Sequence, residues 1–184
     1  NFYYMFYNNQ YVLTGELNDI GEMKASNDNC GESYRAGVEL EAAWKPVSWF
    51  RWDANATFSK NRNKNWTVTL DDYETVVNLG ETHTSFSPEA IFNNIFTFTY
   101  KGLQASIQSQ YVGEQYLTNT DFKSYINYNE DGSVDQEVGM MLKDHFTTNI
   151  NLSYTFGLKK LGIKEATIGL SLYNVFNAKY DNNG

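Results

Sequence analysis

The chain has 184 residues and a formal net charge of −8, with 16% aromatic and 20% charged residues. Many aromatic residues and few charges exclude an intrinsically disordered segment. The acidic balance argues against nucleic-acid binding, which needs clusters of Lys and Arg. The single cysteine, Cys30, excludes an internal disulfide and a zinc site built from several thiolates. No apolar run has the roughly 18 to 20 residues of a membrane helix, and the length alone predicts one domain.

The clearest pattern along the chain is a period of two, which is typical of β-strands with one apolar and one polar face. In chain order it runs through segments 36–44, 50–59 and 145–156. Four weaker segments, 2–13, 86–101, 103–118 and 166–180, complete a prediction of seven strands and no helix. In segment 145–156 we expect Phe146, Ile150, Leu152, Tyr154 and Phe156 on one face and Asn149, Asn151 and Ser153 on the other.

Strands of about ten to thirteen residues are longer than those of most soluble sheets and match a tilted strand that crosses a bilayer. The connections 46–48 and 101–102 are short and 157–165 is modest, whereas 14–33, 67–84 and 119–143 are long and polar. We therefore expect short turns at one end of the sheet and long loops at the other. Aromatic residues gather near the short turns: Trp44, Trp49, Phe50, Trp52, Tyr100 and Phe156.

Two fold classes remain open on these patterns. Alternation with one polar face is also expected of a soluble β-sandwich, in which a second sheet covers the apolar face. Strand length, the asymmetry of the connections and the aromatic band favour an all-β, antiparallel up-and-down meander of about seven long strands within a large transmembrane β-barrel.

The chain also resembles the C-terminal barrel region of TonB-dependent outer-membrane receptors. No single motif is specific, but the ordered combination is, and it covers nearly the whole chain. The final stretch is similar to the family pattern N-[LV]-F-[ND]-x-x-Y near the outer end of the penultimate strand. The stretches that carry the resemblance are FYYMFYNNQYVLTGELNDIG (2–21), SYRAGVELEAAWKPVSWFRWDANATFSKN (33–61), SFSPEAIFNNIFTFTYKGLQASIQSQYVGEQYLTNT (85–120) and LYNVFNAKYDNNG (172–184).

The resemblance implies that residues 1–184 form the C-terminal portion of a receptor barrel, without the plug domain and without the closing strand. It implies an outer-membrane location in a Gram-negative bacterium, long loops on the cell exterior, and membrane lipid, a small-molecule ligand and the TonB complex as partners, the last through the missing N-terminal part. The implied function is ligand-gated active import of an iron chelate, haem, cobalamin or an oligosaccharide, with an iron chelate or cofactor-type ligand preferred. The alternative is a soluble β-sandwich module that binds carbohydrate.

Candidate ligand contacts lie in the long loops. Clustered carboxylates at Asp71, Asp72 and Glu74, beside Tyr73, could hold a cation or orient a cationic ligand, but we prefer a solvated loop surface as their explanation. Aromatic rings at the barrel mouth can stack on a ligand or pack within the loops. The aromatic candidates are Tyr116, Phe122, Tyr125 and Tyr128.

Segment 127–138 loosely resembles a calcium loop, with oxygen-bearing residues around Gly132, but its twelfth position is Val138 where such loops carry Glu. Asp131-Gly132 is also a hairpin-turn signal, and we prefer the turn. The calcium-like residues are Asn127, Asn129, Asp131 and Asp135.

The remaining polar residues point to structure and not to catalysis. Opposite charges on neighbouring strands can pair across the polar face, and Glu39, Glu41, Arg51 and Asp53 have this arrangement. His83 and His145 have no accompanying nucleophile, and we expect both to be non-catalytic. We therefore expect no enzymatic activity, no cofactor and no resident metal.

Overall fold

The computed structural model describes residues 1–17, 23–26, 31–69, 75–158 and 162–181, with the backbone alone described for 13–17 and 23–26. Among these residues every regular element is a β-strand, which confirms the all-β prediction. No helix in this part of the chain has the length and the apolar composition needed to cross a membrane.

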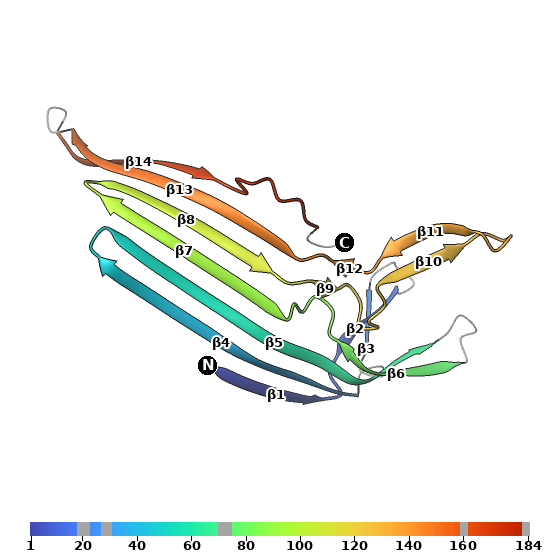
Figure 1. Cartoon of the computed structure of the whole chain (residues 1–184). Coiled ribbons are helices and arrows are strands. Elements are labelled where there is room, and N and C mark those ends of the chain that lie inside the picture. The colour runs from blue at the N-terminus through green and yellow to red at the C-terminus, as the bar shows by residue number, and fades with distance from the viewer. Residues whose placement is uncertain (18–22, 27–30, 70–74, 159–161, 182–184) are drawn as a thin grey trace.

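Most of the described chain forms one antiparallel sheet of eight strands (Figure 1). Seven of them lie side by side in chain order, so the predicted meander is confirmed. The eighth, β6 (Val76–His83), pairs with the far part of β5. The seven are β1 (Phe2–Asn8), β4 (Glu32–Val47), β5 (Phe50–Thr69), β7 (Ala90–Tyr100), β8 (Leu103–Val112), β13 (His145–Leu158) and β14 (Ile163–Leu172).

Short and long connections separate to opposite ends of the sheet, as predicted (Figure 1). We call the end with the β4–β5, β7–β8 and β13–β14 turns the turn end, and the opposite end the loop end. The loop end carries three further strand pairs: β2 (Val12–Leu17) with β3 (Met23–Ser26), β9 (Gln115–Tyr116) with β12 (Met141–Leu142), and β10 (Ser124–Tyr128) with β11 (Val134–Gly139).

Several predicted boundaries were wrong. The predicted strand 2–13 divides at Asn9, whose φ of 52° is a left-handed conformation that asparagine tolerates. The segment 166–180 leaves the sheet after Leu172, because Asn174 and Asn177 also have positive φ. The predicted loops 14–33, 67–84 and 119–143 contain most of the strands of the loop end, since polar hairpins lack the period-two signal that marked the long strands.

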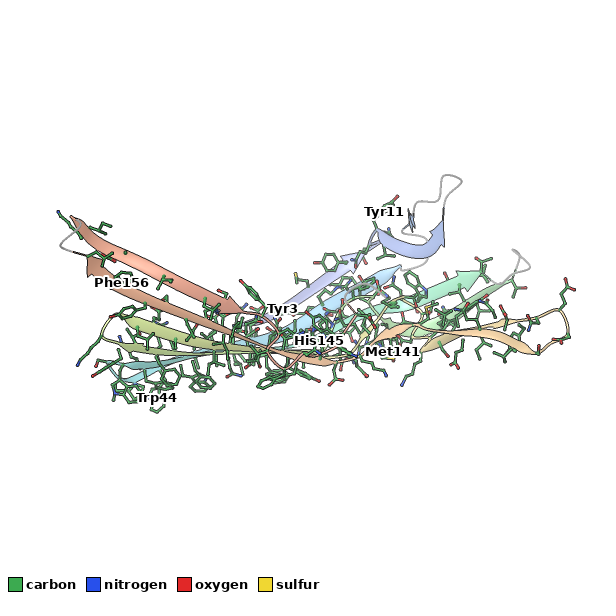
Figure 2. All side chains as sticks on the ribbon, turned by 90° about the horizontal axis from the view of Figure 1, so that it is seen from above. Tyr3, Tyr11, Trp44, Met141, His145 and Phe156 are labelled. Atoms are coloured by element: carbon green, nitrogen blue, oxygen red, sulfur yellow. The ribbon has the colours of Figure 1, made fainter. Side chains whose placement is uncertain are left out.

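The two faces of the sheet differ in polarity and curvature. Cross-strand partners share a face, so the register places Trp44, Trp52 and Phe96 together and sets Tyr3 beside Gly37 on the other face. Figure 2 shows that the edge strands β1 and β14 rise to the same side, with Tyr3 on the concave side and Trp44 on the convex side. The apolar face is therefore convex and the polar face concave.

The predicted alternation in β13 is confirmed. Leu152 pairs with Ala105 and Leu170, which places it on the convex face, whereas Asn151 pairs with Ser106 and Ser171 on the concave face. By the same alternation Phe146, Ile150, Tyr154 and Phe156 join Leu152 on the convex face, and Asn149 and Ser153 join Asn151.

The sheet is a single layer, and little of its apolar surface is covered. In the part of the chain that the structure describes, only Val12, Trp66 and Leu142 are buried hydrophobic residues, and all three belong to the loop end. Large side chains of the convex face remain open, such as Leu170 at 54% and Ile168 at 65% exposure. The convex face would be covered by a second sheet in a soluble sandwich and by lipid in a membrane barrel.

Candidate functional site

The predicted ligand-binding residues that the structure describes, Tyr116, Phe122, Tyr125 and Tyr128, belong to the loop end, where connections from β6 to β7 and from β8 to β13 meet. Backbone and side-chain hydrogen bonds join the two connections. The amide of Phe86 donates to the carbonyl of Tyr116 over 2.9 Å, and the amide of Ser85 donates to Asn119 Oδ1 over 2.8 Å. Asn63, fully buried in β5, donates to the same Asn119 oxygen over 3.3 Å. The connections are therefore anchored to the sheet.

His83 is the centre of a second set of contacts, which we call the His83 junction: His83, Asp121, Glu89, Arg62 and Tyr116. Asp121 accepts the backbone N–H of His83 over 2.7 Å, and its carboxylate lies 2.9 Å from Nδ1. His83 Nε2 lies 3.5 Å from a Glu89 oxygen, and Arg62 donates to the same carboxylate. The imidazole ring also lies 4.7 Å from the Tyr116 ring, centroid to centroid.

Arg62 and Glu89 form the charged pair of the junction. The hydrogen bond from Arg62 holds the pKa of Glu89 below its ordinary value, with smaller contributions from the charges of Arg62 and His83. Burial of the carboxyl acts in the opposite direction and is outweighed. Glu89 therefore remains an anion that fixes Arg62 at the point where β5 leaves β7 for β6.

A pocket of about 400 Å³ opens beside the junction. It is polar and bears carboxylates and phenols, so it can hydrogen-bond a polar molecule. Among the described residues no group of three or more His, Cys, Asp or Glu side chains is arranged to hold a metal ion. The pocket is lined by His83, Ser87, Glu89, Ala90, Tyr111, Gly113, Glu114, Tyr116 and Asp144.

The calcium-like segment forms the hairpin of β10 and β11, as the preferred interpretation predicted. Asn129 and Ser133 close the turn, and Gly132 supplies its left-handed residue at a φ of 79°. The Asp131 carboxylate accepts the Ser133 hydroxyl over 2.6 Å and the Ser133 amide over 2.9 Å. These bonds lower the pKa of Asp131 and hold the turn.

The structure separates the predicted aromatic contacts. Tyr116 is half-buried against His83, whereas Phe122, Tyr125 and Tyr128 are exposed, the last two on the β10–β11 hairpin that projects from the loop end (Figure 1). The candidates of the acidic loop lie outside the described residues, as does Cys30. They are Asp71, Asp72, Tyr73 and Glu74.

The charged residues of the concave face pair differently from the prediction. Arg51 Nε donates to both oxygens of Asp53, over 2.7 and 2.9 Å, along one strand and not across two. Glu39 accepts a hydrogen bond from the side chain of Asn1 over 2.9 Å. These contacts are structural, and a shallow pocket of about 440 Å³ that includes Glu41 lies beside Arg51 and Asp53.

The aromatic band at the turn end is a continuous group on the convex face. Phe50 lies 5.1 Å from Phe98 and 6.3 Å from Phe96, ring centroid to ring centroid. Trp49 stacks on Phe98, and Trp52 stacks on Phe96. The pattern of the sequence located Trp49, Phe50 and Trp52 of this band, whereas Phe96 and Phe98 join it through strand pairing.

Sequence reasoning missed the His83 junction, because its members come from three separate stretches of the chain, at residues 62, 83–89 and 116–121. His83 looked isolated beside Thr82 and Thr84, although the structure gives it partners on two connections. His145 likewise stacks on Tyr180 at 4.2 Å between centroids. No periodic signal marks such contacts, so only the tertiary structure brings them together.

Comparison with known proteins adds no relative to these findings. No protein-family model matches the chain, and no curated protein sequence is significantly similar to it.

Proposed function

We propose that this chain forms part of the wall of a large outer-membrane β-barrel, and that the barrel is an active transport receptor of the TonB-dependent kind. In this proposal the convex face meets lipid and the concave face lines a wet lumen. The loop end lies at the cell exterior, where its hairpins capture a scarce nutrient.

The observation that carries the proposal is the combination of polarity and curvature (Figure 2). A soluble sandwich or small barrel places apolar side chains inside, against a second sheet or against one another. A membrane barrel reverses this arrangement, because its outer surface faces hydrocarbon and its interior holds water. An apolar convex face and a polar concave face favour the membrane barrel.

The dimensions of the convex face agree with this interpretation. At about 3.3 Å per residue and a tilt of about 40°, the segment from Phe50 to Lys60 rises about 25 Å, close to the height of the apolar band of such barrels. Phe50 belongs to the aromatic band at the turn end, and Lys60 is the first charged residue that β5 presents on this face. Aromatic rings at the boundary suit the membrane interface.

Polar side chains within the convex face bond to one another. Trp52 Nε1 donates to Asn94 Oδ1 over 3.1 Å, and the hydroxyls of Ser109 and Thr148 lie 3.1 Å apart. In hydrocarbon an unpaired polar group costs several kcal/mol. Mutual hydrogen bonding lets these four residues occupy a surface that meets lipid.

Membrane association of the full-length protein tests the first half of the proposal. The protein should sediment with the outer-membrane fraction, require detergent for extraction, and aggregate when the detergent is removed. If the protein is monodisperse in plain buffer and does not enter membranes, the proposal that it forms part of a membrane barrel is refuted. That result would support the soluble carbohydrate-binding module.

Growth and uptake test the second half. A deletion strain should lose growth on one defined source of iron, haem, cobalamin or oligosaccharide, and the loss should match that of a strain without TonB. Complementation with a variant that lacks residues 124–139, the β10–β11 hairpin, should restore membrane insertion but lower ligand binding. A deletion strain that takes up all these nutrients normally would contradict the transport role.

A further inference from the structure

A groove of about 1000 Å³ lies on the convex face, near the loop end. Its floor is β4, where small side chains leave room, and its walls are aromatic residues of β1 and β5. β1, the edge strand, and β5 pair with β4 on either side, so the groove follows β4 between them. Its apolar residues are Phe2, Tyr4, Ala36, Val38, Phe58 and Ala90.

Charged groups close the groove on the side towards the loop end. Lys60 pairs with Ala36 in the register, and Arg62 lies one step farther along the same face. Arg62 is bound to Glu89, so these two charges neutralise each other. The Lys60 ammonium, on a side chain that is 55% exposed, lies 3.5 Å from Glu81 in an exposed pair. Lys60 also hydrogen-bonds Tyr34. Exposed contacts of this kind contribute little, so Lys60 can turn towards another anion.

We propose that this groove binds one molecule of a membrane lipid with a phosphate-bearing headgroup. An acyl chain lies over Ala36 and Val38 between the aromatic walls, and the phosphate meets Lys60. The apolar side chains of the groove suit the acyl chain of such a lipid, and the Lys60 ammonium suits its phosphate. The inference rests on the proposed function, because a lipid reaches the groove only if the convex face meets a bilayer.

Native mass spectrometry of the full-length protein tests the proposal. The protein is released from detergent after incubation with dipalmitoyl phosphatidylglycerol or, separately, with dipalmitoylglycerol, which has the same chains but no phosphate. We expect one phosphatidylglycerol per protein to remain bound, in the presence or absence of excess inorganic phosphate, and little dipalmitoylglycerol. Equal retention of both lipids would refute recognition of the headgroup. Displacement of phosphatidylglycerol by inorganic phosphate would mean that the site binds phosphate and not a lipid.

Two matched substitutions locate the site. Ala36→Trp fills the floor of the groove, whereas Ala42→Trp adds the same bulk to the same strand and face outside it. Ala36→Trp should abolish retention and Ala42→Trp should preserve it. Lys60→Gln should lower retention about fivefold, the effect of losing one charge-assisted contact. Equal retention by the two Trp variants would mean that the lipid does not bind in the groove.

Folding and membrane insertion are measured in parallel, so that the two proposals fail separately. If Ala36→Trp does not fold, Ala36→Leu replaces it, again beside Ala42→Leu. A wild-type protein that enters membranes but retains no lipid refutes this inference alone. A wild-type protein that does not enter membranes refutes the proposed function.

Discussion

Replacing Leu152 with Arg should lower the free energy of unfolding in lipid by about 3 kcal/mol. Leu152 lies on the convex face between Ala105 and Leu170, seven residues from the start of β13 and six from its end. A position near the middle of a membrane strand lies near the bilayer midplane, where Arg costs about 2–4 kcal/mol. A cost of about 3 kcal/mol reduces the folding equilibrium constant by about two orders of magnitude.

The assay is equilibrium unfolding of the full-length protein in lipid vesicles with urea, followed by tryptophan fluorescence. The matched control is Asn151→Arg, which adds the same charge to the same strand on the concave face. The proposed function places that charge in a water-filled lumen, where it stays hydrated, so we expect its cost to remain below about 1 kcal/mol. Both variants replace a strand residue with Arg, so effects on strand propensity largely cancel. The remaining difference in the free energy of unfolding reports the environment of the convex face.

Two outcomes would refute this reasoning. Equal effects of Leu152→Arg and Asn151→Arg would mean that the faces do not differ in environment. A large cost for Leu152→Arg that persists in plain buffer, without vesicles, would mean that Leu152 packs against protein, as in a sandwich.

Three further predictions concern single contacts. Gly102→Ala should destabilise the protein by more than about 1 kcal/mol in the same unfolding assay, because a Cβ there would lie 2.4 Å from the Thr155 carbonyl oxygen and φ is +84°. Glu89→Gln should remove a pH dependence of stability: the contribution of the Arg62 contact is complete above the ordinary carboxyl pKa and is lost as the pH falls through the lowered pKa of Glu89. Asp121→Asn should speed proteolysis of the connection between β8 and β13, because the charged contact to the imidazole is lost.

Each of these has its own control. Gly132→Ala, at a φ of 79° but with open space around the new Cβ, should cost less than Gly102→Ala, and a reversed order would contradict the steric argument. An unchanged acid dependence in Glu89→Gln would mean that another group causes it. The proteolysis result fails if Asp131→Asn, in the β10–β11 turn, accelerates the same cleavages as much as Asp121→Asn.

The amino-acid sequence determined the long strands of the sheet and their two faces. Strand formation needs only alternation, and segments such as 50–59 and 145–156 repeat it long enough to define both faces and the place of each turn. Short turns such as Lys101-Gly102 also follow from local chemistry, because a left-handed glycine suits a two-residue hairpin. These features depend on neighbours along the chain.

The tertiary structure alone decided the rest. The direction of curvature, which places Trp44 on the convex side, arises from the twist and coiling of all strands together and has no local signature (Figure 2). The contact of His83 with Asp121 joins residues that are far apart in sequence, and the groove over Ala36 depends on which strands pair with β4. Alternation gives each residue a face, but only strand order and register decide which residues meet there.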